Sequence, residues 1–136
     1  MSDSEHTVRT LLDAVSSRDY ATQRACLADD LVMETPYAPA EFPNRHEGPD
    51  TFVTALAASD AAFESKVLEV DELYRLDDQD VVIAVYHTNA TTKRGGAFDQ
   101  QYVGFFWLAN GKVARWREYY DPDVIRRTFK LPLTFD

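Results

Sequence analysis

The chain has 136 residues, 45% of them hydrophobic and 27% charged, a composition that predicts one soluble domain, residues 1–136, with a buried core. Its net charge of −9, from 14 basic and 23 acidic residues, argues against nucleic acid or an anionic membrane as a partner, since both require a basic surface. Because Cys26 is the only cysteine, neither an intramolecular disulfide nor a cysteine-based metal site is possible.

The first part of the chain predicts two helices and a strand. Its first ten residues, MSDSEHTVRT, are polar and lack the apolar segment of a signal peptide, so we expect a cytoplasmic protein. Apolar side chains recur at helical spacing over residues 4–17. Asp19 has the position of an N-cap for a second helix that ends near Leu27, and the sequence LVMET predicts a strand at residues 31–35.

A proline-rich segment separates this strand from a third helix. Pro36, Pro39 and Pro43 each remove a backbone donor and disfavour helix before them, which predicts a loop over residues 36–47. Long loops in compact domains are often lids or binding loops, so we expect this one to cover the mouth of a site. The third helix is predicted over residues 48–63, with a proline that suits its first turn.

The second half of the chain predicts an antiparallel meander. The turn sequences DDQD, KRGG and ANGK separate its strands, and the last contains the Asn-Gly pair typical of a two-residue hairpin. A short helical segment, DVIRRTF, follows the last strand. The expected strands are residues 65–76, 80–92, 98–109 and 112–120. This order of elements predicts an α+β fold, with a curved sheet and helices on one of its faces.

One carboxylate lies on an otherwise apolar face of the last strand. Because side chains alternate along a strand, Glu118 shares its face with Trp116 and Tyr120. A register set by the Asn-Gly turn places Glu118 opposite Val103. The preceding turn then places Val103 opposite His87, so that the three side chains form one row. A slip of one residue at that turn would move His87 to the other face.

This row predicts a pocket for a hydrophobic small molecule. His87 and Glu118 would lie two strands apart, roughly 9–10 Å at the backbone, with the small Val103 between them. A carboxylate among aromatic side chains resists ionisation, so its pKa should rise, and a glutamate of raised pKa near a histidine suits general acid–base catalysis. The expected substrate-binding residues are Tyr120, Gln101, Thr35, Trp116, Phe105, Val85, Met33 and Val103.

Purely structural explanations remain open for the same residues. Glu118 could pair with an arginine or reach solvent at the sheet edge, His87 could be a hydrogen-bonded core residue, and Tyr120 could serve core packing alone. His6, His46 and His87 are scattered without the spacing of metal ligands, so no metal is expected. We find neither a phosphate-binding loop nor a nucleophile motif, and we expect no cofactor.

The complete pattern resembles a known superfamily. The helix–helix–ADD–strand opening and the GKV…WREYYDP ending are similar to nuclear transport factor 2-like proteins, above all to their SnoaL-like branch, over nearly the whole chain. The resemblance implies a cone-shaped α+β barrel with a deep pocket between sheet and helices. It also implies a homodimer through the outer face of the sheet. On the expected register, that outer face carries Tyr86, Tyr102, Phe106, Arg117 and Tyr119.

Three members of this superfamily narrow the expected activity. Ketosteroid isomerases have a base where this chain has Thr35, and oxyanion donors where it has Leu11 and Val103, so their mechanism is not expected. Limonene epoxide hydrolase resembles the WREYYD and LPL sequences, with a catalytic aspartate at the position of Glu118, but its water-holding residues are missing. Phenazine-biosynthesis A/B-like proteins have a functional glutamate at the same position, whereas their histidine corresponds to Ala55.

The residues and the resemblance together favour a cofactor-free acid–base enzyme of secondary metabolism. It would be of the isomerase or cyclase type and act on a hydrophobic carbonyl compound, with Glu118 moving the proton and His87 as its partner acid. One alternative is epoxide hydrolysis of the limonene epoxide hydrolase type. Another is a dimeric ligand-binding module without catalysis. Because this fold hosts many unrelated activities, the sequence does not identify the substrate.

Overall fold

The computed structural model describes residues 3–76 and 79–131, which form four helices and a six-stranded sheet. The helices are α1 (Asp3–Ser17), α2 (Tyr20–Cys26), α3 (Pro49–Asp60) and α4 (Pro122–Phe129). The strands are β1 (Leu27–Glu34), β2 (Arg45–Glu47), β3 (Phe63–Arg75), β4 (Val81–Thr92), β5 (Ala97–Ala109) and β6 (Lys112–Tyr120). The expected helices and the four-strand meander are therefore confirmed, with small shifts at their ends.

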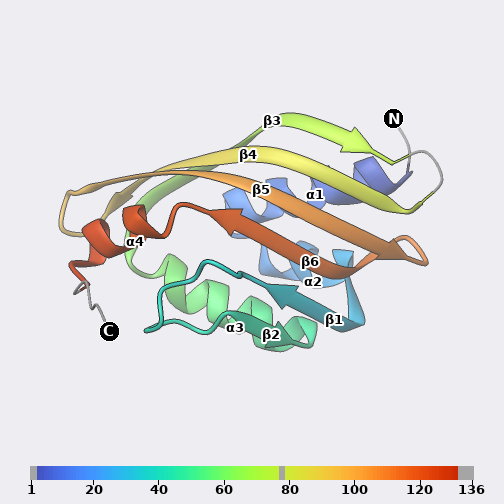
Figure 1. Ribbon diagram of the computed structural model, residues 1–136, viewed down its shortest axis with the longest axis horizontal. Helices are drawn as coiled ribbons and strands as arrows, with labels where there is room; N and C mark the ends of the chain where they lie inside the picture. Colours follow the sequence, from blue (N-terminus) through green and yellow to red (C-terminus); the bar gives the residue numbers. More distant parts are fainter. Residues whose placement is uncertain (1–2, 77–78, 132–136) are drawn as a thin grey trace.

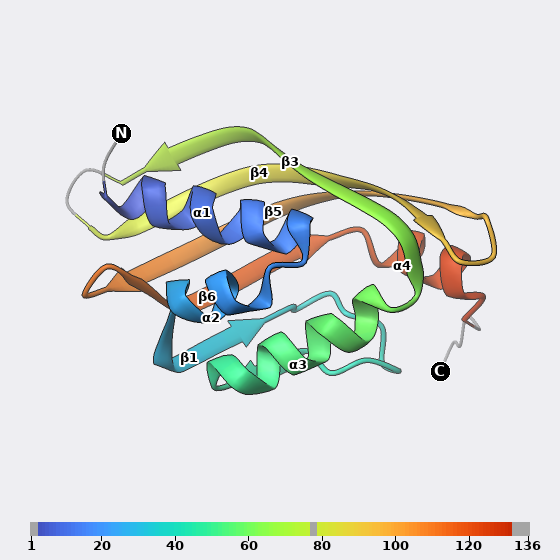
Figure 2. The same cartoon turned by 180° about the vertical axis from the view of Figure 1, so that it is seen from behind.

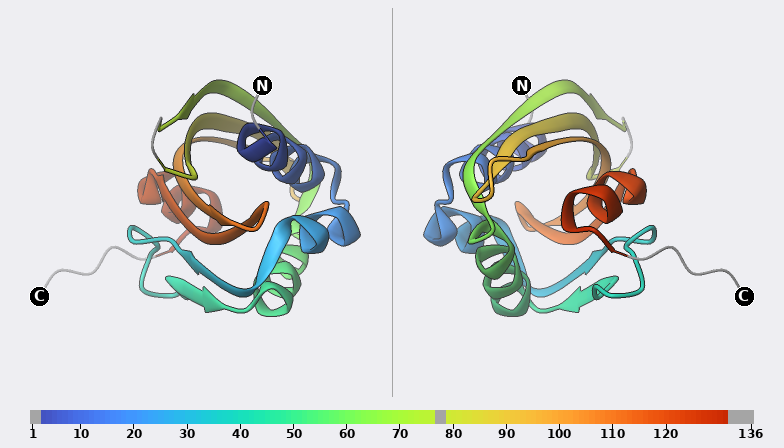
Figure 3. Two further views of the ribbon diagram at one scale, coloured as in Figure 1. Left: turned by 90° about the vertical axis from the view of Figure 1, so that its right-hand side faces the viewer. Right: turned by 90° about the vertical axis from the view of Figure 1, so that its left-hand side faces the viewer.

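The sheet is mixed and strongly curved. Its strand order is β2-β1-β6-β5-β4-β3, in which only the pairing of β1 with β6 is parallel. Figure 1 shows the long meander strands side by side, and the end-on views of Figure 3 show the sheet curling around an interior that α1, α2 and α3 help to enclose. The α+β fold with three N-terminal helices on one face is confirmed, and the parallel pair makes the sheet mixed instead of wholly antiparallel.

The first two helices form where their sequence signals lie. The apolar stripe of α1, which includes Val8, Leu11 and Leu12, is fully buried. Asp19 is the N-cap of α2, because its carboxylate accepts a hydrogen bond from the backbone N–H of Thr22 at 3.1 Å. Figure 2 shows α1 and α2 crossing the concave side of the sheet. In the described part of the chain, no helix combines the length and apolar character needed to cross a bilayer.

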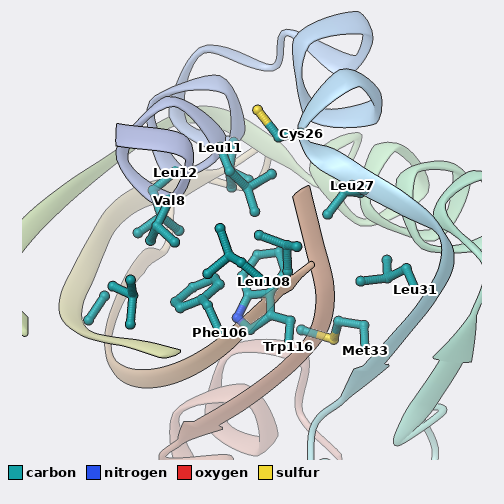
Figure 4. Packing of buried hydrophobic residues seen from close by; sticks show 14 of the residues in the cluster. Val8, Leu11, Leu12, Cys26, Leu27, Leu31, Met33, Phe106, Leu108 and Trp116 are labelled. Atoms are coloured by element: carbon teal, nitrogen blue, oxygen red, sulfur yellow. The ribbon is translucent and has the colours of Figure 1, made fainter. Parts of the chain in front are cut away.

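The main core fills the space between α1, β1 and the sheet. Figure 4 shows side chains of α1 directed toward aromatic side chains of the meander, with β1 closing the cluster from the side. Phe52 of α3 packs edge-on against Trp116, with ring centroids 5.2 Å apart. The labelled members are Val8, Leu11, Leu12, Cys26, Leu27, Leu31, Met33, Phe106, Leu108 and Trp116. Met33, Phe52 and Trp116 belong to this cluster and also line the cavity described below.

A bulge in β6 changes the expected register. Ala109 pairs with Lys112, as the Asn-Gly turn predicts, but Trp107 then pairs with Arg115, which leaves Ala114 as an extra residue. Every later pair is shifted by one position, so Glu118 lies opposite Gly104 and not opposite Val103. Because side chains alternate, this shift of one residue exchanges the two faces of β5 relative to β6.

The expected register between β4 and β5 is also wrong. Val103 pairs with Val85, and His87 pairs with Gln101. This shift keeps Val103 and His87 on one face, so it is the bulge in β6 that separates both of them from Glu118. The row of His87, Val103 and Glu118 expected from the sequence therefore does not form.

The proline-rich segment contains a short strand that the sequence did not predict. Residues Arg45–Glu47 form β2, which pairs antiparallel with β1 through Met33 and His46 and their neighbours. The backbone N–H of Thr35 also donates to the carbonyl of Asn44 at 2.9 Å. These backbone hydrogen bonds hold both ends of the remaining loop, residues 35–44, next to β1.

Candidate functional site

A pocket opens on the concave side of the sheet, between the meander, α3, α4 and the loop before β2. Its volume is about 290 Å³, close to the lower end of the range usual for small-molecule sites. Apolar and aromatic side chains make up most of its wall. The polar groups that line it are Thr35, His46, Ser59, Asp60, Lys66, Tyr86, Thr88, Tyr102, Glu118 and Tyr120, with the indole of Trp116.

Half of the expected site residues line this pocket. Glu118, Trp116 and Tyr120 contribute from β6, and Met33 and Thr35 from β1 and the residue after it. Their convergence follows from two features. Alternation on β6 brings three of them to one face, and parallel pairing places Met33 next to Trp116.

The other half lies on the outer face of the sheet, and their expected place beside Glu118 is wrong. Those residues are His87, Gln101, Val85, Val103 and Phe105. The bulge at Ala114 is the physical cause, since it turns the odd-numbered residues of β5 and their β4 partners away from the interior.

His87 in particular has a surface partner. Its Nδ1 lies 2.8 Å from a carboxylate oxygen of Asp71, and this hydrogen bond raises the pKa of the imidazole. The His87 side chain is therefore part of an outer-face pair with Asp71. It cannot serve as the acid partner of Glu118 that the sequence suggested.

Glu118 is a half-buried residue whose carboxyl group lies in the apolar wall of the pocket. Burial raises its pKa from the ordinary value of 4.5 to about 7. Two weaker effects oppose the rise: a hydrogen bond from the hydroxyl of Tyr86 to Oε2, and the positive charge of Lys66. Near neutral pH both protonation states of this carboxyl are therefore populated, as a group that must accept and return a proton requires.

Three phenols surround this carboxyl and stay protonated. Burial, followed by the charge of Glu118, raises the pKa of Tyr86, Tyr102 and Tyr120, in the last case to about 12. The rings of Tyr86 and Tyr102 stack with centroids 5.0 Å apart, and the hydroxyl of Tyr102 lies 3.2 Å from that of Thr88. The single O–H of Tyr86 is used on Glu118, whereas the phenol of Tyr120 can donate a hydrogen bond to an oxygen inside the pocket.

The register expected from the sequence placed Tyr86 and Tyr102 on the outer face, because it did not include the bulge at Ala114. One residue in the sequence does indicate that a side chain approaches β5 closely at this point. Gly104 lies in the middle of β5 opposite Glu118, and a glycine inside a strand often marks a close approach. A Cβ at this position would lie 3.0 Å from the Tyr86 hydroxyl, so the glycine makes room for that phenol.

The mouth of the pocket is aromatic. Phe42 from the loop faces Phe129 from α4, with ring centroids 6.4 Å apart, and both rings are about two-fifths exposed, at 41% and 37%. Pro43 and His46 also line the pocket, and burial lowers the pKa of the His46 imidazole. The segment expected to act as a lid thus supplies three wall residues.

The polar groups of the site do not form a metal centre. Within residues 3–76 and 79–131, no three His, Cys, Asp or Glu side chains gather as metal ligands would. What the arrangement offers is a titratable carboxyl, several phenol donors and an apolar wall. These are the parts of a site for proton transfer on a hydrophobic molecule.

Replacing Tyr86 by phenylalanine should raise the pKa of Glu118 further above 7. The substitution removes the hydrogen bond that stabilises the carboxylate and leaves the burial unchanged. Carbon NMR of the labelled carboxyl measures the shift. Tyr102→Phe is the matched control, since that hydroxyl bonds to Thr88 and its loss should leave the Glu118 titration nearly unchanged. Equal titrations in wild type and Tyr86→Phe would show that the hydrogen bond does not tune the carboxyl.

Solved structures with a similar fold include a proposed isomerase, a proposed polyketide cyclase and an epoxide hydrolase. A proposed isomerase of Bacillus subtilis is 22% identical, with a TM-score of 0.84 and coverage of 98% of this chain and 99% of the other. IdmH, a proposed polyketide cyclase from Streptomyces antibioticus, is 17% identical, with a TM-score of 0.77 and coverage of 94% and 99%. An LEH-like epoxide hydrolase of M. tuberculosis is 22% identical, with a TM-score of 0.70 and coverage of 94% and 87%.

These likenesses show a shared nuclear transport factor 2-like fold and leave the activity open, since one fold carries many functions. The sequence itself matches a family model, that of the SnoaL-like domain, over residues 8–125. This range extends from α1 into α4 and contains every strand of the sheet. The chain therefore belongs to the SnoaL-like domain family.

Proposed function

We propose that this protein is a cofactor-free acid–base enzyme of the isomerase or cyclase type. Its substrate would be a small, hydrophobic, carbonyl-containing molecule, and secondary metabolism is the setting that polyketide cyclases of similar fold suggest. The observation that carries the proposal is Glu118, whose half-buried carboxyl lines an apolar pocket and has a pKa of about 7, so that it can exchange a proton near neutrality.

In the proposed reaction, the Glu118 carboxylate takes a proton from a carbon next to the substrate carbonyl. The electron pair of that C–H bond moves to the carbonyl oxygen and gives an enolate. Glu118, now protonated, returns the proton to another carbon of the enolate or to the product of ring closure. The hydrogen bond from Tyr86 fixes the orientation of the carboxyl throughout.

The phenol of Tyr120 is the proposed donor to the enolate oxygen. It is only half-buried, lies in the pocket wall beside Glu118, and interacts with the hydroxyl of Thr35. A pKa of about 12 keeps it protonated, so it can stabilise a developing oxyanion with little reorganisation. Trp116, Phe52 and other apolar wall residues would hold the body of the substrate and exclude water.

Deuterium exchange tests this function directly. Hydrophobic carbonyl compounds that contain an acidic C–H bond would be incubated with the protein in deuterium oxide and followed by proton NMR. We expect deuterium to enter at the carbon next to the carbonyl in at least one compound, with wild type and not with Glu118→Gln. Solvent oxygen in the product from heavy-oxygen water would indicate epoxide hydrolysis instead, and ligand binding without exchange would favour a binding module.

We also propose a homodimer through the outer face of the sheet. This face carries Phe105 stacked on Trp107 at 6.1 Å, and the guanidinium of Arg115 lies 4.8 Å from the centroid of that indole. Val103 stands on the same face and is 37% exposed. Apolar and aromatic side chains with arginine are the composition usual for the centre of a protein interface.

Val103→Asp should convert this dimer to a monomer and leave the melting temperature of the subunit nearly unchanged. An unpaired carboxylate at the centre of an interface loses its hydration without gaining a partner. Sedimentation or light scattering gives the mass. Val67→Asp is the matched control: Val67 is 51% exposed on the same face but on the edge strand β3, two strands from Val103, so a carboxylate there should keep its hydration and remain compatible with a dimer. A monomeric wild type, or a dimeric Val103→Asp, would rule out this interface.

A further inference from the structure

The pocket contains a buried ion pair that the proposed proton transfer does not use. The ammonium of Lys66 on β3 contacts Oδ1 of Asp60 at the end of α3, and their side chains are only 7% and 2% exposed. The hydroxyl of Tyr20 donates to the other oxygen, Oδ2, at 2.8 Å. Both members of the pair line the cavity.

Of the two partners, only Lys66 has N–H groups left for a further hydrogen bond. Each carboxylate oxygen of Asp60 already has a donor, one from Lys66 and one from Tyr20. A lysine ammonium has three N–H groups, and across residues 3–76 and 79–131 Asp60 is the only acceptor bonded to it. Asp60 therefore anchors the ammonium from the helix side, and the cavity is the place where a further acceptor can sit.

Stability alone is a weak reason for such a pair. Removing two charges from water costs about as much free energy as their attraction returns, and apolar residues of similar volume commonly serve a core equally well. A neutral resting pair does, however, place a cation in the wall of a largely apolar cavity. An anionic ligand atom that reaches this ammonium would meet preorganised donors at low dielectric.

Lys66 enters the cavity from β3, and Glu118 enters it from β6. Along β4, Tyr86, Thr88 and Ala90 face the interior in succession. Tyr86 bonds to Glu118, and Ala90 pairs with Lys66. Four residues of strand span roughly 13 Å at the backbone. Both side chains line the same cavity, and the charge of Lys66 also acts on the pKa of Glu118.

We propose that Lys66 is a specificity-determining residue that binds an anionic oxygen of the ligand. The site would take an elongated hydrophobic molecule with a carboxylate, enolate or phenolate at the Lys66 end. The inference rests on the proposed function in one respect, namely that the reacting carbonyl of the same molecule would lie at Glu118. The small residue Thr88, which lines the cavity on β4, between the strands of Lys66 and Glu118, leaves that space to the body of the ligand.

A pair of probes that differ only in charge tests this inference. 2-Naphthoate and 2-naphthamide have the same ring system, and titration calorimetry gives the affinity of each. At about pH 8 Glu118, with a pKa of about 7, is mostly ionised and disfavours a carboxylate at its own end. We expect wild type to bind naphthoate about 10- to 100-fold more tightly than naphthamide, the effect of a charge-assisted hydrogen bond.

The double variant Lys66→Met, Asp60→Asn should lose this preference, since it removes the cation without leaving an unpaired carboxylate. Lys66→Arg should keep it, as should Lys112→Met, which removes an exposed lysine at the start of β6. NMR of labelled lysine in wild type gives a second readout that needs no variant at the pair. The Lys66 signal should shift with naphthoate and stay in place with naphthamide.

The inference is overturned if wild type binds naphthoate no better than naphthamide, or if the double variant keeps the preference. A Lys66 NMR signal that does not shift when naphthoate is added would overturn it as well. The proposed function fails on a different readout, namely deuterium exchange that persists in Glu118→Gln. That variant should retain the preference for naphthoate, because it leaves Lys66 and Asp60 in place, so the two failures are distinguishable.

Discussion

Glu118→Gln should abolish the deuterium exchange of a carbonyl substrate while the protein remains folded. Glutamine has nearly the same shape and can still accept the hydrogen bond from Tyr86, but it cannot take up a proton. General acid–base catalysis by one group contributes about 10²–10⁴-fold, so the loss should be of that size or down to the uncatalysed rate. The wild-type rate should rise with pH through about 7, as the carboxyl ionises to the active base.

The same substitution should stabilise the protein above neutral pH. In wild type the folded state holds the Glu118 proton up to a pKa of about 7, against 4.5 for an unperturbed glutamate. Between these values the folded state binds more protons than the unfolded state, so the free energy of unfolding falls as the pH rises. Above about pH 7 the ionised carboxylate costs the fold up to about 3 kcal/mol, at 1.36 kcal/mol for each tenfold change in ionisation.

Urea denaturation at about pH 5 and at about pH 8 measures this effect. Glu118→Gln should unfold at higher urea than wild type at the higher pH, and the difference should shrink at the lower pH. Glu64→Gln, a change of the same type at an exposed position on β3, is the matched control and should show no such pH-dependent gain. A Glu118→Gln protein that exchanges deuterium at the wild-type rate would remove the carboxyl from the mechanism.

Local signals in the sequence predict most of this fold. The structure confirms the apolar spacing of α1, the Asp19 cap of α2 and the KRGG and ANGK turns, all of which depend on neighbouring residues alone. The first half of the expected DDQD turn, residues 77–78, lies outside the described residues. Glu118 could also be identified, because a carboxylate between Trp116 and Tyr120 conflicts with the pattern of an apolar face. Local inconsistencies of this type often lie at functional sites.

The partners of Glu118 could not be predicted in the same way. Their identity depends on the pairing of strands, which one extra residue at Ala114 shifts along the rest of β6. Alanine is not typical of β-bulges, so no local feature of the sequence predicts the shift in register. The pair of Lys66 and Asp60 was missed for a related reason. Alternation places a residue on a face of its strand but does not show which helix end covers it.

Gly104→Ala should both destabilise the fold and raise the pKa of the Glu118 carboxyl. A Cβ at this position would lie 2.8 Å from Cε1 of Phe106 and 3.0 Å from the hydroxyl oxygen of Tyr86. Phe106 and Tyr86 are 0% and 1% exposed, so neither ring has free space to move into. Overpacking of this kind costs about 1–3 kcal/mol.

The clash also has a chemical consequence, because the phenol that must move is the donor to Glu118. Displacing it weakens the hydrogen bond that opposes the effect of burial, so the pKa of Glu118 should rise together with the loss of stability. Thermal melting and carbon NMR of the carboxyl give the two readouts. Gly96→Ala is the matched control, since a Cβ there meets only the Thr92 hydroxyl oxygen at 3.4 Å. If Gly104→Ala melts like wild type with an unchanged Glu118 titration, Tyr86 does not fill the space that Gly104 leaves, and the register that joins Gly104, Tyr86 and Glu118 is wrong.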